Sequence, residues 1–402
     1  MKNINKLFVI LLCIICYSCS DSDDGNDNAT LGKLSVYLKD TEGKPVKDAF
    51  VVMSGLEKNR VITMGEGLSD VNGKWLPYYK GSVDGYISVV SPKYEPCKER
   101  FSYDGKYETK LEITLKSTES ISVLSYNVLN GFDNKVNKKQ RFLEWIQTYD
   151  PDIMLFQELN NFTEASLLEF AKQYGHEYAY ITKETGYPTG LTSRYPITDV
   201  EKVLRGSDPN IYTYHGFIHA KCQGIDIFVI HLSPFELKDR ITEITNIVDK
   251  KIKQLPADAK VLVAGDFNSY NAYDAKAYGP KFETERLKFS PTVTFSYEVT
   301  DFLLDNGFKD AFTLYSNGHF KQSIPVSTTE FPENKGCRYD YIMLNKNLAN
   351  DCTYSDVLRE KTTNVLSDHY PNYIRLNIKK ISLSFFYLNL IHAPFIEKTF
   401  YD

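Results

Sequence analysis

Residues 31–116 consist of short stretches in which apolar and polar side chains alternate. The run "GKLSVYLKD" has this period of two, and "TEGKPVKDAFVVMSG" is typical of a turn followed by a strand. The Asn-Gly pair in "SDVNGKWLPYY" favours a tight hairpin turn, and "GSVDGYISVVSPKYEPCKERFSY" and "KYETKLEITLK" continue the pattern. Short strands separated by regularly spaced turns predict a small all-β sandwich.

The pattern changes after the short linker "KSTES". Nearly continuous apolar runs now alternate with stretches whose apolar residues recur at helical spacing. Such apolar runs are typical of strands that are covered on both faces, so residues 120–380 are predicted to form an α/β domain. Strands are predicted at 121–129, 152–159, 225–232, 259–267, 338–344 and 370–378, and helices at 135–150, 163–175, 236–255 and 299–312.

The N-terminal residues have the pattern of an export signal. Positive charge in "MKNINK" precedes the apolar run "LFVILLCIIC", which is too short for an ordinary membrane span. "YSCS" and the acidic run "DSDDGNDN" follow, and the arrangement resembles the signal of surface-exported Bacteroidetes lipoproteins. The resemblance implies a signal peptide at 1–18, lipidation of Cys19, an acidic tether at 19–30 and a lipid-anchored protein at the outer membrane and cell surface. The alternative is a plain secretory peptide that is cleaved nearby.

Composition narrows the range of functions. The chain has 402 residues, 25% of them charged, and a formal net charge of −5. It therefore lacks the overall basic character with which nucleic-acid-binding modules neutralise phosphates, although an enzyme that meets phosphates through a metal ion is still compatible. The cysteines beyond the N-terminal region permit three disulfide pairings, and none has the CxxC spacing of a zinc site; they are Cys97, Cys222, Cys337 and Cys352.

Polar side chains stand at the carboxyl ends of several predicted strands. Each one alone could be a turn-former, but catalytic groups also gather at strand ends, where a rigid sheet holds them. Their number in one domain favours an active site, and all are metal ligands or hydrogen-bonding groups: Asn127, Gln157, Glu158, His231, Asp266 and Asn268.

Seven motifs, four of which contain these residues, make the pattern specific. In chain order they are "SYNVLNG", "FQEL", "GLTSRYPI", "HLSPF", "AGDFNS", "RYDYIML" and "LSDHYP". The series resembles that of the endonuclease/exonuclease/phosphatase superfamily, which includes pancreatic-type deoxyribonuclease, abasic-site endonucleases, neutral sphingomyelinases and inositol-polyphosphate phosphatases. The resemblance spans residues 120–380 and implies a four-layer αββα sandwich with the active site at one edge of the packed sheets.

The resemblance also implies a metal site. Glu158 matches the metal carboxylate of the family, Asn127 an amide beside the metal and the phosphate, and Asp368 a further acid on the metal side. Oxygen ligands of this kind suit Mg²⁺, with Mn²⁺ as an alternative.

The same resemblance assigns catalytic roles to five further residues. His369 would contact the phosphate as base or electrostatic stabiliser, and Asp340 would orient it. Asp266 and Asn268 would flank the attacking water. His231 matches a second histidine of the deoxyribonuclease and sphingomyelinase branches and is a candidate acid for the leaving oxygen.

Asp368 and His369 are adjacent in "LSDHYP", yet they need not pair with each other. Neighbouring side chains on extended backbone point in different directions. We therefore expect Asp368 to face the metal and His369 to face the phosphate, with Asp340 as the partner of the imidazole. Glu184 is a candidate partner for His231, whereas His215 and His219 are expected in a strand-like stretch without a catalytic role.

Two further segments lie outside this resemblance. Residues 31–116 resemble transthyretin-like, carboxypeptidase-regulatory-type domains through "D…G.PV..A.V", "D.NG.W" and "GY…V", which implies a stalk or a carbohydrate-contacting module. The C-terminal extension at 381–402 is expected to add an edge strand or to contact a membrane surface, or it is a gene end unlike that of relatives.

The sequence therefore predicts a metal-dependent phosphoric ester hydrolase, first of all a Mg²⁺-dependent phosphodiesterase that uses a His/Asp-activated water. Its substrate would be a phosphate ester in nucleic acid, phospholipid or a small phosphodiester, and no obligate protein partner is inferred. The alternatives are a phosphomonoesterase acting on inositol-type phosphates and a surface binding or adhesion lipoprotein that keeps the scaffold.

Overall fold

The structure, a computed structural model, describes residues 33–380 apart from 58, 78, 80, 279–281, 283–294 and 327–335. The predicted signal peptide at 1–18, the lipidation site at Cys19, the tether at 19–30 and the extension at 381–402 lie outside the described residues. Within the described part of the chain, none of the helices has the length and hydropathy needed to cross a membrane.

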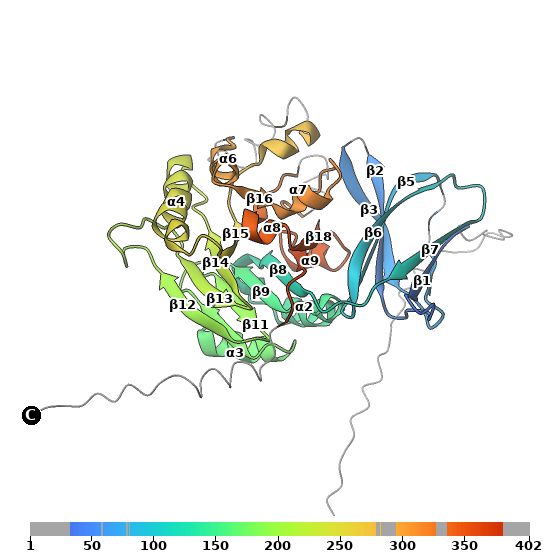
Figure 1. Cartoon of the computed structure of the whole chain (residues 1–402), viewed down its shortest axis with the longest axis horizontal. Coiled ribbons are helices and arrows are strands. Elements are labelled where there is room, and N and C mark those ends of the chain that lie inside the picture. Colours follow the sequence, from blue (N-terminus) through green and yellow to red (C-terminus); the bar gives the residue numbers. More distant parts are fainter. Residues whose placement is uncertain are drawn as a thin grey trace, which may run out of the picture. The chain divides into compact units, whose positions relative to one another are not determined.

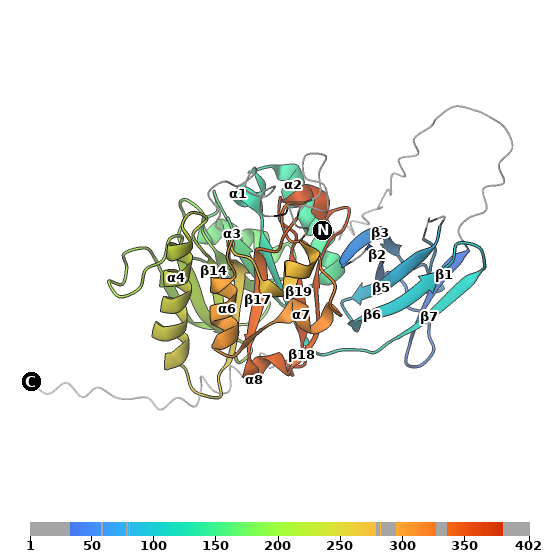
Figure 2. The same cartoon turned by 90° about the horizontal axis from the view of Figure 1, so that it is seen from above.

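The first region is an all-β sandwich, as its alternating pattern predicts (Figure 2). One sheet has the strand order β4-β1-β7 and the other the order β3-β2-β5-β6. Apolar side chains of both sheets, among them Val36, Val51 and Ile87, are buried in one core. The strands are β1 (Leu34–Asp40), β2 (Phe50–Glu57), β3 (Arg60–Leu68), β4 (Lys74–Trp75), β5 (Val83–Ser91), β6 (Tyr94–Tyr103) and β7 (Thr109–Leu115).

The second region contains two six-stranded sheets, with the orders β10-β11-β9-β8-β19-β18 and β12-β13-β14-β15-β17-β16. The pairs β8/β9 and β14/β15 are parallel, and the other pairs are antiparallel. The first sheet contains β8 (Ile121–Asn127), β9 (Ile153–Gln157), β10 (Tyr178–Ile181), β11 (Gly190–Ser193), β18 (Cys352–Val357) and β19 (Asn372–Leu376). The second contains β12 (Ile197–Val203), β13 (Phe217–Cys222), β14 (Ile225–His231), β15 (Lys260–Asp266), β16 (Phe308–Asp310) and β17 (Asp340–Asn345).

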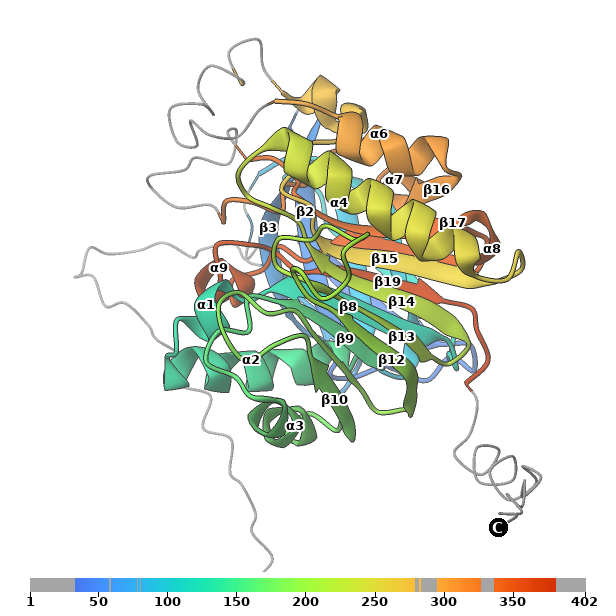
Figure 3. The same ribbon diagram turned by 90° about the vertical axis from the view of Figure 1, so that its left-hand side faces the viewer.

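Helices cover the outer faces of these two sheets, which completes four αββα layers (Figures 1 and 3). On the first sheet, α2 (Val136–Tyr149) and α3 (Glu164–Lys172) bury Phe142 and Phe170. On the second, α4 (Leu237–Lys250) and α6 (Glu298–Asp305) bury Ile244 and Leu303. A third apolar cluster lies between the sheets and confirms the predicted sandwich. The shorter helices are α1 (Leu129–Phe132), α7 (Ala311–Tyr315), α8 (Lys346–Ala349) and α9 (Thr363–Leu366), with the 3₁₀ turns η1 (Ile252–Gln254) and η2 (Ala272–Ala277).

The helix boundaries follow local chemistry. Asp150, with a φ of 41°, ends α2 directly before Pro151, which disfavours helical backbone at the preceding residue. Thr163 and Ser166 form a capping box at the start of α3. The hydrophobic pattern does not reveal β10, β11, β12, β16 and β18. Three of them, β10, β11 and β16, have only three or four residues, and β12 and β18 have polar side chains at half or more of their positions. The four described cysteines are free thiols.

Backbone hydrogen bonds join β3 to a loop that supports the catalytic region. The N–H of Val61 donates to the carbonyl of Phe320 at 2.9 Å, and the N–H of Phe320 donates to the carbonyl of Asn59 at 2.7 Å. Three residues further on, the hydroxyl of Ser323 accepts the N–H of Asp340 at 3.1 Å. The segment that holds the start of β17 is therefore itself held by β3.

Candidate active site

The parallel pairs of strands deliver acidic and amide side chains to one edge of the sandwich. Asn127 ends β8 and Glu158 follows β9, while His231 ends β14 and Asp266 ends β15. Asp340, the first residue of the antiparallel β17, lies directly opposite Asp266. Residues from both sheets therefore meet at the same end of the sandwich.

His369 lies at the centre of this group and is 4% exposed. Its Nδ1 is 2.8 Å from Asp340 Oδ2, and its Nε2 is 3.7 Å from Asp266 Oδ2. The adjacent Asp368 is much less closely engaged, with Oδ1 3.9 Å from Nε2 of the imidazole and a side chain that is 47% exposed. Burial alone would lower the pKa of His369, but the carboxylates of Asp340, Asp368 and Asp266 outweigh it and raise that pKa well above its usual value.

Asn127 connects the carboxylates of Glu158 and Asp266. Its Nδ2 donates to Glu158 Oε1 at 3.2 Å and to Asp266 Oδ2 at 3.1 Å. The second oxygen of Glu158 accepts the N–H of Asn130 at 3.0 Å. Glu158 and Asn130 both have positive φ, 61° and 50°, which is uncommon for residues other than glycine and is often found at functional sites. This backbone geometry turns Glu158 toward Asn127.

The glycine of the "AGDF" motif is required for a steric reason, and the residues that follow it are required for their chemistry. Gly265 has a φ of +146°, and a side chain there would meet the carbonyl oxygen of Ile230 at 1.9 Å. The close approach of β14 and β15 therefore requires glycine just before Asp266. The N–H of Asn268 donates to Asp266 Oδ1 at 2.8 Å, and Asn268 Nδ2 donates to the carbonyl of Leu232 at 3.0 Å. Burial raises the pKa of Asp266, and the charge of His369 offsets only part of that rise.

His231 completes the group from the β14 side, with Nε2 3.8 Å from Asp266 Oδ2. Burial lowers its pKa well below the usual value, and the neighbouring His215, His369 and Lys183 lower it further. Glu184 is not its partner, because that carboxylate accepts the N–H of Glu164 at 3.1 Å.

The donor set fits a hard divalent cation. Ligand atoms of Asp266, Asp340 and His369 all lie within 4.8 Å of one another, and Glu158 is bridged to Asp266 by Asn127. Among the described residues, the buried Asp340 Oδ1 has no hydrogen-bond partner. Three carboxylates beside one imidazole leave excess negative charge in a buried place, and oxygen-rich sets of this kind suit Mg²⁺ or Mn²⁺.

Two polar positions behave differently from the sequence-based expectation. Gln157 is fully buried within the sheet, where its Nε2 contacts Ser125 Oγ at 3.4 Å. His215, which the sequence did not favour, stacks on His231 with ring centroids 4.4 Å apart. His215 lies outside the seven motifs, so no local sequence pattern indicated its position beside His231. Ser367 was also missed; its hydroxyl donates to the carbonyl of Asn127 at 2.7 Å and accepts the N–H of His369 at 3.2 Å.

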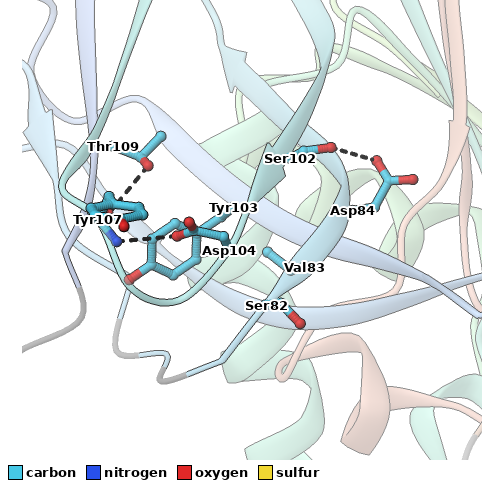
Figure 4. Close-up of a pocket in the computed structure, with 8 residues that line it drawn as sticks. All are labelled: Ser82, Val83, Asp84, Ser102, Tyr103, Asp104, Tyr107 and Thr109. Atoms are coloured by element: carbon cyan, nitrogen blue, oxygen red, sulfur yellow. Dashed lines mark hydrogen bonds between the residues drawn. The ribbon is translucent and has the colours of Figure 1, made fainter.

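A separate depression of about 490 Å³ lies in the all-β region (Figure 4). Its acidic groups are used locally: Asp104 accepts the N–H of Tyr107 at 3.1 Å, and Asp84 accepts the hydroxyl of Ser102 at 3.1 Å. These groups stabilise a turn and a strand pair, and the described residues that line the depression include no histidine, cysteine or lysine.

Several solved structures are similar to this one. The structure is similar to an AP endonuclease from Archaeoglobus fulgidus (18% identity, TM-score 0.50, covering 64% of this chain and 100% of the other). It is also similar to the 3′ phosphatase NExo from Neisseria bound to a product DNA hairpin (20%, 0.49, 64% and 99%) and to the 3′-5′ exonuclease NExo from Neisseria meningitidis (22%, 0.49, 64% and 100%). At these identities the likeness concerns the fold. No curated protein matched the sequence.

The sequence also matches a protein family. Residues 124–369, more than half of the chain, match the family described as the Endonuclease/Exonuclease/phosphatase family. The matched segment contains every residue of the acidic and imidazole cluster. The chain therefore belongs to the endonuclease/exonuclease/phosphatase family of phosphoester hydrolases.

Proposed function

We propose that the protein is a Mg²⁺-dependent phosphodiesterase that hydrolyses its substrate with water activated in the cluster around His369. The observation that carries this proposal is the chain of contacts from Asp340 through His369 to Asp266, at 2.8 and 3.7 Å, in a buried place with excess carboxylates. Such a place favours a cation, and the bound cation together with the protonated imidazole would attract a phosphoryl group.

His369 is positioned to contact the phosphoryl group. Asp340 holds its Nδ1, so Nε2 is the ring atom that faces the reacting groups. Because the surrounding carboxylates raise its pKa, the imidazole is protonated and donates a hydrogen bond to a nonbridging oxygen. Of the two roles expected for His369, this geometry favours the electrostatic stabiliser.

Asp266 is the better candidate for the base. Its Oδ1 is fixed by the N–H of Asn268, which leaves Oδ2 among Asn127, His369 and His231. Burial raises the pKa of this carboxyl toward the range in which general bases work best. Asp266 would accept a proton from the attacking water, while Asn268 keeps the carboxylate oriented.

His231 lies on the opposite side of Asp266 from Asp340 and meets the leaving oxygen in this proposal. Because its pKa is lowered, the ring is neutral and assists by a hydrogen bond from an N–H group, not as a full imidazolium acid. Glu158, Asn127 and Asp368 would hold Mg²⁺, which neutralises phosphate charge and lowers the pKa of bound water.

The test compares purified protein on bis-p-nitrophenyl phosphate and on p-nitrophenyl phosphate, with Mg²⁺, with Mn²⁺ and with chelator, beside His369→Gln. We expect Mg²⁺-dependent turnover of the diester that the variant loses. Faster turnover of the monoester would favour the phosphomonoesterase alternative. If neither ion supports turnover of these esters, of DNA, of sphingomyelin or of inositol phosphates, the surface-binding alternative is correct.

We also propose that the protein is a lipid-anchored surface protein, in which the all-β region serves as a stalk between anchor and enzyme. The supports are the N-terminal sequence pattern and the resemblance of residues 31–116 to transthyretin-like domains. Radiolabelled palmitate should enter the full-length protein expressed in a Bacteroidetes host and should not enter Cys19→Ala. Equal labelling of the two proteins would contradict the anchor.

A further inference from the structure

A second group of side chains borders the active site next to His231. The ring of His215 stacks on that of His231, with centroids 4.4 Å apart and an interplanar angle of 24°. The register of the β13–β14 hairpin, in which Ile218 lies opposite Val229, brings the loop before β13 to the end of β14. Both imidazoles are buried, with 6% and 4% of their surface exposed.

Each of these two imidazoles has an unsatisfied nitrogen. Considering the described residues only, His215 Nε2 and His231 Nδ1 are buried and have no hydrogen-bond partner. Leaving such a group unpaired is costly, so proteins rarely place two of them side by side without a ligand or water. The pair is therefore poorly explained as core packing.

Aromatic rings and cations continue outward from His215. The rings of Tyr187 and Tyr214 meet it edge-on at 5.5 and 4.8 Å, and the guanidinium of Arg205 lies 5.1 Å from the ring of Tyr214. Lys183 belongs to the same β10–β11 connection as Tyr187. Burial is the main cause that lowers the pKa of His215 to about 4, and the nearby charge of Lys183 adds to it.

Lys183 and Arg205 differ in their contacts from two other basic residues of the sandwich. Lys202 and Lys251 form ion pairs with Glu164 and Glu201. In the described structure, Lys183 and Arg205 have neither an ion pair nor a hydrogen bond. Unpaired cations beside unsatisfied imidazoles are a suitable surrounding for an anion.

We propose that Lys183, Arg205 and His215 form a second anion subsite beside the scissile phosphate, which binds a further phosphate group of the same substrate. The proposal rests on the proposed function only in placing the scissile phosphate at His369. Tyr187 and Tyr214 flank the part of the substrate that joins the two phosphates. The preferred substrate class is therefore a phosphate ester that carries a neighbouring phosphate, as in an oligonucleotide or an inositol polyphosphate.

Calorimetric titration of the full-length protein tests this with pairs of ligands that differ by one phosphate. Thymidine 3′,5′-bisphosphate is compared with thymidine 5′-monophosphate, and inositol 1,4-bisphosphate with inositol 1-phosphate, each with and without Ca²⁺. In at least one pair the bisphosphate should bind about tenfold more tightly, the size expected for charged hydrogen bonds. The ligand pair that shows this preference identifies whether the neighbouring phosphate belongs to a nucleotide or to an inositol phosphate.

The double variant Lys183→Met/Arg205→Met should bring that affinity ratio close to one. Lys250→Met/Lys309→Met, which removes two exposed lysines, is the control for net charge and should keep the wild-type ratio. Equal affinity within both pairs, or an unchanged ratio in the double variant, would overturn the subsite. A clear bisphosphate preference in a protein that hydrolyses no phosphate ester would refute the proposed function and leave the subsite standing.

Discussion

Two buried acidic clusters lie next to each other along the chain, and they differ in how their charge is balanced. Arg338 is fully buried, with Nε 2.8 Å from Asp274 and Nη2 2.6 Å from Asp310. Two residues later, Asp340 joins a cluster that has several carboxylates and, among the described residues, only His369 as a cationic partner. The first cluster contains its own permanent cation, whereas the second is incomplete without one.

The pKa shifts have the same directions in both clusters and so do not separate them: in the first cluster burial also raises the pKa of Asp274 to about 6, although Arg338 lowers it. Burial alone would lower the pKa of Arg338, but Asp274 and Asp310 outweigh it and raise that pKa well above its usual value. In the active-site cluster, burial raises the pKa of Asp266, and the single imidazole offsets only part of the rise. Arg338 stays charged at every working pH, whereas His369 must be protonated and faces more carboxylates, so a bound cation would remove more of the cost in the active-site cluster.

The largest expected effect is the loss of activity when the imidazole is removed from the unbalanced cluster. His369→Gln should lower kcat/KM by about 10³-fold, because the stabilising contact to the phosphoryl group disappears. Steady-state kinetics on the diester measures this. The matched control is His219→Gln, a histidine paired with Asp226 at 2.9 Å that lies outside the cluster and should keep its activity. A loss below tenfold would remove His369 from the reaction.

The next largest effect is a loss of stability when the cation is removed from the Arg338 cluster. Arg338→Met leaves two buried carboxylates without a partner and should lower the free energy of unfolding by about 3 kcal/mol. Urea denaturation followed by circular dichroism measures the change. Adding Asp274→Asn and Asp310→Asn to this variant should recover part of the stability; no recovery would show that charge balance is not what Arg338 provides.

Binding of a divalent cation should offset the excess negative charge of the active-site cluster and so stabilise the folded protein. At about 100 times its Kd, Mg²⁺ should raise the free energy of unfolding by about 2.7 kcal/mol, through binding to the folded state alone. Thermal denaturation with and without Mg²⁺ reports this gain, which should shrink in Glu158→Gln. Asp310→Asn, which alters the other cluster, should keep the gain. The prediction fails if Mg²⁺ stabilises both variants equally.

The smallest effect concerns the metal-free protein. Since burial raises the pKa of Asp266 from 3.8 to about 7, the folded state favours its protonated form. The resulting stability is fully present below pH 3.8 and is lost as the pH rises through about 7. Asp266→Asn should therefore equal the wild type at pH 4 and exceed it by about 1 kcal/mol at pH 7 in chelator. A wild type that is the more stable protein at pH 7 would contradict this account.

The sequence alone determined the type of most secondary-structure elements. The apolar run before Asn127 and the helical spacing around Phe142 follow from how each element buries one face or both. It also indicated which residue types stand at strand ends, because those types are local in the chain.

Only the tertiary structure decided which of these polar residues meet. Gln157 and Glu158 are neighbours, yet the positive φ of Glu158 sends one into the sheet and the other toward Asn127. Likewise, the start of β17 places Arg338 and Asp340 in separate clusters, and the β13–β14 register brings His215 onto His231. Strand register and loop backbone set these contacts between distant residues, and neither is encoded in a local hydrophobic pattern.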